Sequence, residues 1–170
     1  MRAKAHRCFG FTLVEVLVVV MIIGIASAIV VPHMISGGQL GVQAAARMVI
    51  ADIIYAQNEA VAHQVIRRVV FDPKQESYRI TDAAGTTLSV RWKSGGDVGQ
   101  NYVVDFEEDD RFSGVQLDNV DFGGATTLEF DDMGSPAIGG IVELTSGDFR
   151  YRITVAAFTG QVTIKAVTGG

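Results

Sequence analysis

A run of 31 residues without a formal charge, positions 16–46 with His33 counted as neutral, dominates the N-terminal part of the chain. Residues 11–31, which overlap this run, read FTLVEVLVVVMIIGIASAIVV. As an α-helix, this stretch is about 31 Å long, close to the roughly 30 Å hydrocarbon core of a bilayer. A core helix of a water-soluble domain is the alternative, but it would normally carry a polar face. We therefore predict a transmembrane helix over residues 11–35.

The charges that flank this helix predict its orientation. Residues 1–10 carry Arg2, Lys4 and Arg7 and no acidic residue, and no basic residue follows the apolar run before Arg47. Since basic residues stay on the cytoplasmic side, we expect a cytoplasmic N-terminus and an exported C-terminal part. The net charge of the whole chain, −5 from 14 basic and 19 acidic residues, hides this division. The only cysteine, Cys8, precedes the helix, which excludes an internal disulfide.

Three residues at the start of the apolar run, a glycine, a phenylalanine and a glutamate, form a distinctive pattern. Gly10 separates the basic segment from the run, Phe11 begins it, and Glu15 lies inside it. A carboxylate in such a segment costs a few kcal/mol unless it lies near the interface or has a partner. Glu15 is therefore a candidate functional residue.

Residues 1–35, with the pattern G-FTLVEVLVVVMIIGIASAIVVP, resemble the class III signal of type IV pilins and type II secretion pseudopilins. The resemblance implies that a prepilin peptidase removes a leader, residues 1–10, by cleavage between Gly10 and Phe11, and methylates the Phe11 amine. It implies that Glu15 attracts the N-terminal amine of a neighbouring filament subunit, and that the helix bends at Gly24 and Pro32. An α-amino group is largely protonated at neutral pH and would pair strongly with a carboxylate in a low-dielectric bundle.

The sequence pattern of residues 36–64 predicts an amphipathic helix that continues the first helix. Gly37, Gly38 and Gly41 weaken helix propensity at its start, so we expect a hinge or frayed turn there. Beyond them, apolar residues recur at spacings of three and four and form one stripe: Val42, Ala45, Val49, Ile53, Ala56 and Ala60.

In residues 65–170, apolar and polar residues alternate with a period of two, which predicts seven or eight short antiparallel strands. The clearest runs are 88–93, 149–155 and 162–165, and turn sequences such as Ser146-Gly147-Asp148 separate them. The expected fold class is α+β, similar to type IV pilins: a long N-terminal helix packed on a C-terminal antiparallel β-sandwich, here a periplasmic β-rich domain.

This order of elements resembles the GspH/FimT family of pseudopilins. The segment FDDMGSP, residues 130–136, and the turn FTGQV, residues 158–162, are similar to that family's F-x-x-x-G-x-P segment and closing glycine hairpin. Members of the FimT branch that bind nucleic acid have a G-R-x-R pattern at the hairpin. Here Gly160 is followed by Gln161 and Thr163 occupies the second arginine position, so nucleic-acid binding is not expected. Arg150 and Arg152 alternate along one strand face and are interpreted as a solvated sheet face.

The chain lacks the sequence motifs of a catalytic site, a phosphate loop or a dinucleotide fingerprint. We therefore expect neither enzymatic activity nor a cofactor, and no metal site is assigned. A calcium site is the weaker alternative to local turn hydrogen bonds for the aspartates Asp118, Asp121, Asp131 and Asp132.

The function implied by the resemblance is that of a minor pseudopilin, a structural subunit of a type II secretion pseudopilus that supports protein export across the outer membrane. The alternative is a FimT-like minor type IV pilin that takes part in pilus assembly or DNA uptake. The implied partners are other pseudopilins, the prepilin peptidase and methyltransferase, and an inner-membrane assembly platform. The implied location is the bacterial inner membrane, spanned once, with the C-terminal domain in the periplasm.

Overall fold

The structure is a computed structural model that describes residues 12–35, 37–90 and 101–168. The chain divides into two compact units, residues 1–37 and residues 38–170, and each is described by itself. Gly10 and Phe11, the predicted cleavage site, lie outside the described residues.

The first unit contains one helix, α1 (Leu13–Ile35). Gly24 and Pro32 both lie within its bounds, and the bend expected at these residues stays a prediction. Among the described residues, no helix combines the length and the apolarity that a membrane crossing requires.

Helix α2 (Gly37–His63), which belongs to the second unit from Gly38 onward, carries the predicted apolar stripe. As predicted, all six residues of the stripe are buried, with at most 1% of their surface exposed. Gly38 and Gly41 are helical, so the expected loose turn is not found at these residues. A Cβ at Gly41 would lie 3.7 Å from the Arg111 carbonyl and 3.8 Å from Val115, in ordinary van der Waals contact, so this packing does not require a glycine.

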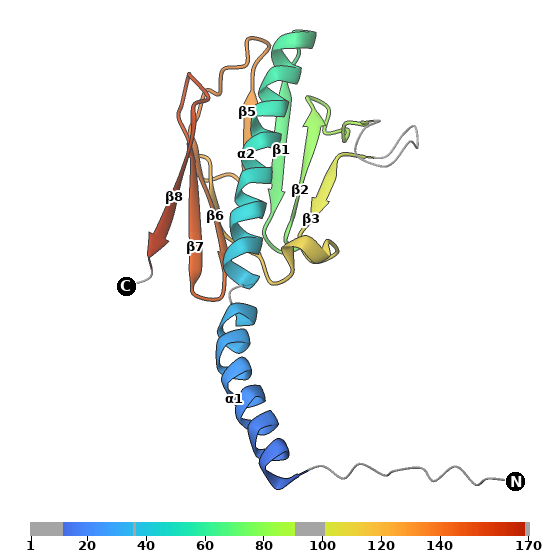
Figure 1. The fold of residues 1–170 in the computed structure, drawn as a ribbon. Helices are drawn as coiled ribbons and strands as arrows, with labels where there is room; N and C mark the ends of the chain where they lie inside the picture. Colours follow the sequence, from blue (N-terminus) through green and yellow to red (C-terminus); the bar gives the residue numbers. More distant parts are fainter. Residues whose placement is uncertain (1–11, 36, 91–100, 169–170) are drawn as a thin grey trace, which may run out of the picture. The chain divides into compact units, whose positions relative to one another are not determined.

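Eight strands follow in the described part of the chain and form two antiparallel sheets (Figure 1). The first sheet has the order β3-β2-β1-β5 and consists of β1 (Arg67–Asp72), β2 (Ser77–Asp82), β3 (Val103–Asp105) and β5 (Thr127–Phe130). The second has the order β4-β6-β7-β8 and consists of β4 (Gln116–Asp121), β6 (Gly140–Ser146), β7 (Phe149–Val155) and β8 (Val162–Thr168). A short 3-10 helix, η1 (Asp110–Phe112), precedes β4.

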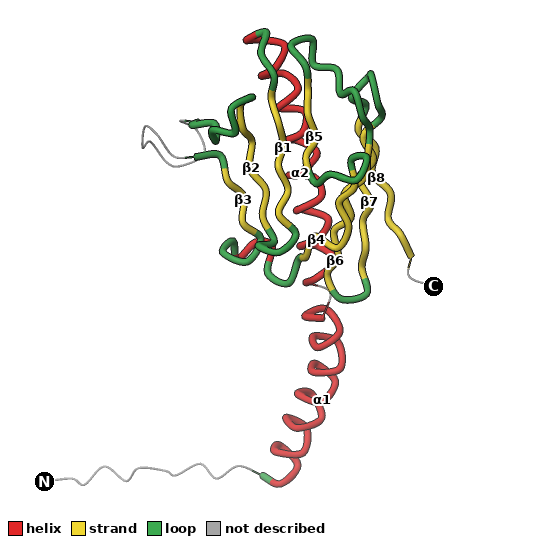
Figure 2. Tube along the Cα trace, turned by 180° about the vertical axis from the view of Figure 1, so that it is seen from behind, coloured by secondary structure: helices red, strands yellow, loops and turns green. Residues whose placement is uncertain are grey.

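Both sheets lie on the same side of α2 and share one core with it. Helix α2 runs in front of the strands in Figure 1 and behind them in Figure 2, which is seen from the opposite side. Aromatic side chains fill much of the core. The Phe71 ring of β1 stacks on Phe122 with 6.0 Å between the ring centroids, and the Tyr78 ring of β2 lies against Phe106 with 5.8 Å between the centroids. The expected α+β class, with antiparallel β-structure after the helices, is confirmed.

Two details of the predicted strands need correction. Thr87 and Ser89 form only isolated bridges, to Thr81 and Asn101, so no regular strand begins at residue 88, and Trp92 lies outside the described residues. Strand β8 forms as predicted, but Ile164 is 40% exposed rather than buried. Pairing along the ladder, rather than burial of one face, therefore defines β8.

Candidate functional site

The first turn of α1 has a side-chain cap that involves the predicted assembly residue. The backbone amide of Glu15 donates to Thr12 Oγ1 at 3.2 Å, and the amide of Val16 donates to the Thr12 carbonyl at 3.2 Å. A threonine followed three residues later by a glutamate is the spacing of a capping box. The spacing of Thr12 and Glu15 thus defines the start of the helix and places the carboxylate in its first turn.

The side chain of Glu15 is exposed, and no residue in the described part of the chain forms an ion pair with it. At the N-terminus of a helix, the backbone dipole favours a carboxylate. The Phe11 amine, which the resemblance assigns as its partner in a neighbouring subunit, lies outside the described residues. In the isolated chain, Glu15 is thus accessible to a cation from outside.

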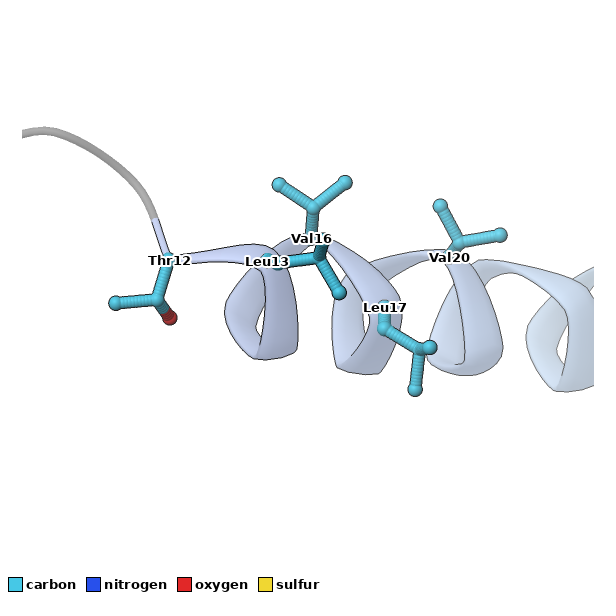
Figure 3. A pocket seen from close by; sticks show the side chains of 5 residues that line it. All are labelled: Thr12, Leu13, Val16, Leu17 and Val20. Carbon is cyan, nitrogen blue, oxygen red and sulfur yellow. The ribbon is translucent and has the colours of Figure 1, made fainter.

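The rest of the described surface of α1 is apolar and uncovered. The large apolar side chains between Leu13 and Ile25 are 45–82% exposed. Figure 3 shows a shallow depression of this surface, lined by Thr12, Leu13, Val16, Leu17 and Val20. Water-soluble monomers rarely leave such a continuous apolar surface exposed, and it is typical of contact with lipid or another protein.

A buried carboxylate joins α2 to the first sheet. Asp52 is 5% exposed, and its Oδ2 accepts a hydrogen bond from the Tyr78 hydroxyl of β2 at 2.5 Å. Its Oδ1 accepts a second bond from the Tyr102 hydroxyl, and the Tyr102 ring stacks on Tyr55 at 5.6 Å. The pKa of both phenols is raised far above its ordinary value, mainly by burial and secondly by the interactions with Asp52. The network fixes the position of α2 over the sheet.

The two segments that carry the GspH/FimT resemblance in the C-terminal half lie against each other in the structure. Ser135 Oγ donates to the Phe158 carbonyl at 2.6 Å, and the Phe158 amide donates to the Pro136 carbonyl at 2.7 Å. Gln57 of α2 then braces both segments, because its amide nitrogen donates to the Gly134 carbonyl at 2.7 Å and to the Thr159 carbonyl at 3.4 Å. One helical side chain therefore holds two turns that are distant in the sequence.

Both glycines of these segments are required by geometry. Gly134 has φ +75°, and a Cβ there would lie 2.6 Å from the side chain of Val61. Gly160 has φ +66°, and a Cβ there would lie 2.5 Å from the amide nitrogen of Gln57. Positive φ and the close approach of α2 both exclude a larger residue without strain.

The joined turns present two large apolar side chains to solvent. Met133 is 81% exposed and Phe158 is 76% exposed. Phe158 also has φ +64°, an uncommon conformation for an aromatic residue. Its backbone is anchored on both sides by the hydrogen bonds to Pro136 and Ser135, so the surrounding structure stabilises the conformation.

The arginines of β7 are engaged within the protein. Arg150 contacts Asp118 at 2.6 Å and Glu143 at 3.1 Å, and Arg152 contacts Glu143 at 2.5 Å. The Glu143 side chain is only 4% exposed, so these pairs also compensate a buried carboxylate. The interpretation of a solvated sheet face rather than a groove for phosphates is consistent with this pairing.

Two of the four aspartates considered for calcium accept hydrogen bonds within their own turns. Asp121 accepts from the Gly124 amide at 2.7 Å, and Asp131 accepts from the amides of Met133 and Ser135 at 3.0 and 2.7 Å. Within residues 12–35, 37–90 and 101–168, no group of three potential ligands among His, Cys, Asp and Glu could hold a metal ion.

The prokaryotic N-terminal methylation motif matches residues 5–31, which include the predicted cleavage site and Glu15. A curated relative, the type II secretion system protein H of Xanthomonas campestris pv. campestris, is 25% identical over 155 residues. The match covers 90% of this chain and 80% of the relative. In its N-terminal motif and along most of its length, the chain is thus similar to the minor pseudopilins of the GspH/FimT kind.

The fold of the chain is similar to that of a solved type IV minor pilin. The type IV minor pilin FimU of Pseudomonas aeruginosa has a TM-score of 0.51 at 16% identity, and the match covers 74% of this chain and 92% of FimU. The minor pseudopilin EpsH of the type 2 secretion system of Vibrio cholerae has a TM-score of 0.49 at 15% identity, and the match covers 74% of this chain and 96% of EpsH. The likeness to FimU shows a shared pilin-like fold.

Sequence reasoning missed two residues that organise the second unit. Asp52 lies next to Ile53 within the apolar stripe, three residues after Val49, and an acidic residue in that position is a signal of a buried polar partner. Gln57 gave no comparable signal, because an isolated glutamine on a helix is an ordinary surface residue.

Proposed function

We propose that this chain is a minor pseudopilin, a structural subunit of a type II secretion pseudopilus, and thereby supports protein export across the outer membrane. The single observation that carries the proposal is the methylation motif at residues 5–31, joined in one chain to similarity with a type II secretion protein H along 90% of its length. The subunit acts by assembly rather than by catalysis.

In this proposal, a prepilin peptidase cuts between Gly10 and Phe11 and methylates the new N-terminus. Residues 11–35 anchor the precursor across the inner membrane once, with the N-terminus in the cytoplasm and residues 65–170 in the periplasm. The exposed apolar side chains from Leu13 to Ile25 support this role, since lipid covers them before assembly and neighbouring helices cover them afterwards. An inner-membrane assembly platform transfers the subunit from the membrane into the filament.

Glu15 supplies the register of the assembled helices in this proposal. Its carboxylate is exposed in the first turn of α1 and has no ion-pair partner in the described part of the chain. The methylated Phe11 amine of an adjacent subunit is a cation of the right sign, and a pair formed in an apolar bundle is far stronger than one in water. Only one axial offset between neighbouring helices brings the two groups together.

The proposal is tested by complementing a deletion of the gene with the wild type, with Glu15→Gln and with the control Glu107→Gln. Glu107 is an exposed carboxylate outside α1, so its variant controls for the loss of one negative charge. We expect Glu15→Gln to accumulate in membranes in its cleaved form but to fail in secretion of an exported reporter enzyme, whereas Glu107→Gln restores it. Normal secretion with Glu15→Gln would contradict the assigned role of Glu15.

A minor type IV pilin of the FimT kind is the second candidate function, because the chain shares its fold with the minor pilin FimU. The same deletion strain separates the two. Loss of exoprotein secretion with intact surface pili supports the pseudopilus, and loss of pili or of DNA uptake with intact secretion supports the pilus. The pairing of Arg150 and Arg152 with carboxylates argues against DNA capture by that sheet face.

A further inference from the structure

Strand β8 is the longest of the four edge strands in the two described sheets. The other three sheet edges each carry a feature that limits pairing with another chain: β3 has three residues, β5 has four, and β4 has a register shift between Leu117 and Asn119. In contrast, β8 has seven residues, pairs with β7 without a shift from Val162 to Thr168, and contains no proline. Short strands, bulges, prolines and charged side chains, above all lysine, are the usual means by which proteins block edge pairing, and of these β8 has only the charged Lys165.

The outer edge of β8 is accessible. In both Figure 1 and Figure 2, β8 is the outermost strand of its sheet and lies away from α2. Among the residues that the structure describes, no segment other than β7 pairs with it. Its backbone N–H and C=O groups on the outer side are therefore available to an added strand.

The side chains of β8 specify what kind of strand fits. Ile164 is paired with Ile153 of β7, which is fully buried, yet Ile164 itself is 40% exposed. The apolar inner face of the sheet therefore continues to the edge, where nothing in the described part of the chain covers it. An added strand with apolar residues on this side would bury Ile164.

The opposite face of β8 carries a positive charge. Lys165, its single charged residue, is paired in register with Arg152, whose guanidinium is held by Glu143. No carboxylate in the described part of the chain forms an ion pair with Lys165. A carboxylate opposite Lys165 on an added strand would complement this charge.

We propose that the free edge of β8 binds an extended segment of a different protein chain by strand addition, with apolar residues against Ile164 and a carboxylate opposite Lys165. A second copy of this chain is a poor occupant. Lys165 is the central residue of β8, so full antiparallel pairing of two β8 strands would place Lys165 opposite Lys165. This inference names the kind of partner for a filament subunit and in that sense rests on the proposed function.

The test uses the full chain in detergent and capped seven-residue peptides as probes. The first peptide has valine at its odd positions, threonine at the second and sixth, and glutamate at the centre; the second has lysine at the centre. A third peptide repeats the first with alternate backbone nitrogens methylated, which removes the donors that pairing needs. Binding is measured by the protection of β8 amides from hydrogen exchange, with β3 and β4 as internal references.

We expect the glutamate peptide to protect β8 and to bind roughly fivefold more tightly than the lysine peptide, as cross-strand charge pairs predict. Lys165→Glu should reverse this preference, and Lys74→Glu, the same charge change at an exposed turn residue, should leave it unchanged. The methylated peptide should not bind. These outcomes do not depend on secretion, so they are separable from failure of the proposed function.

Four results would overturn the proposal: no protection of β8 by any peptide, equal binding of the two charged peptides, protection of β3 or β4 instead, or undiminished binding of the methylated peptide. Protection of β8 that rises with protein concentration in the absence of peptide would identify a second copy as the occupant and would also overturn it. Circular dichroism of Lys165→Glu checks that the variant is folded.

Discussion

Replacement of Asp52 by alanine should destabilise the second unit strongly, because it leaves two buried tyrosine hydroxyls without their acceptor. Tyr78 and Tyr102 both donate to this carboxylate, and Asp52 is 5% exposed. Hydrogen bonds to a charged acceptor contribute about 1.5–3 kcal/mol each, or about 3–6 kcal/mol for the pair. Removing a carboxylate from the interior returns part of its desolvation cost, so we expect a net loss of about 2–4 kcal/mol in the free energy of unfolding.

The matched variant removes the polar atoms of the network together. In Asp52→Ala, Tyr78→Phe, Tyr102→Phe, no buried hydroxyl of this network is left without a partner, so its free energy of unfolding should lie about 1 kcal/mol or less below that of the wild type. Urea unfolding of the full chain in detergent, followed by far-ultraviolet circular dichroism, measures both variants. A loss below about 0.5 kcal/mol for Asp52→Ala, or a triple variant no more stable than Asp52→Ala, would refute the reasoning.

Three further predictions concern the buried tyrosines, the glycine at position 160 and the arginines of β7. Folding raises the pKa of the Tyr78 and Tyr102 phenols, so their contribution to the free energy of unfolding is complete below about pH 10 and is lost as the pH rises further. The urea midpoint of unfolding should therefore fall above that pH, and Tyr78→Phe should make this fall less steep. Gly160 has φ +66°, so Gly160→Ala should lower the free energy of unfolding by about 1–2 kcal/mol through backbone strain alone. The new Cβ would also lie 2.5 Å from the Gln57 side chain, and this clash should add to the loss. Gln57→Ala should relieve the clash, so an equal loss from Gly160→Ala in the wild type and in Gln57→Ala would contradict this prediction. In gel-shift assays at low salt, the full chain should not retard DNA, because the β7 arginines are already paired, and salt-sensitive retardation would contradict this account.

Much of the fold follows from period and spacing in the sequence. The six-residue stripe of α2 is buried as its spacing of three and four predicts, and β7 covers Phe149–Val155 as its alternation predicts. These elements were predictable because one face of each packs on the core. The run at residues 88–93 alternates equally well, yet in its described part, residues 88–90, it does not form a regular strand: Thr87 and Ser89 form only isolated bridges, to Thr81 and Asn101.

The candidate site divides in a similar way. Glu15 could be singled out from the sequence because a carboxylate in an apolar run is costly wherever the run folds. The role of Gln57 could not, because it depends on two turns, at Gly134 and Thr159, that only the tertiary structure brings to the same side chain. The glycine motifs lie between these cases: the pattern was visible, but its reason, the close approach of α2, required the structure.

The account rests on the claim that this chain is a processed filament subunit, and the mass of its mature form tests that claim most directly. The protein is purified from cells that contain a prepilin peptidase, and its N-terminal peptide is analysed by mass spectrometry. The account predicts a chain that begins at Phe11 and carries one methyl group on the Phe11 amine. A chain that retains residues 1–10, or one cut within the apolar run near Ser27, would contradict it.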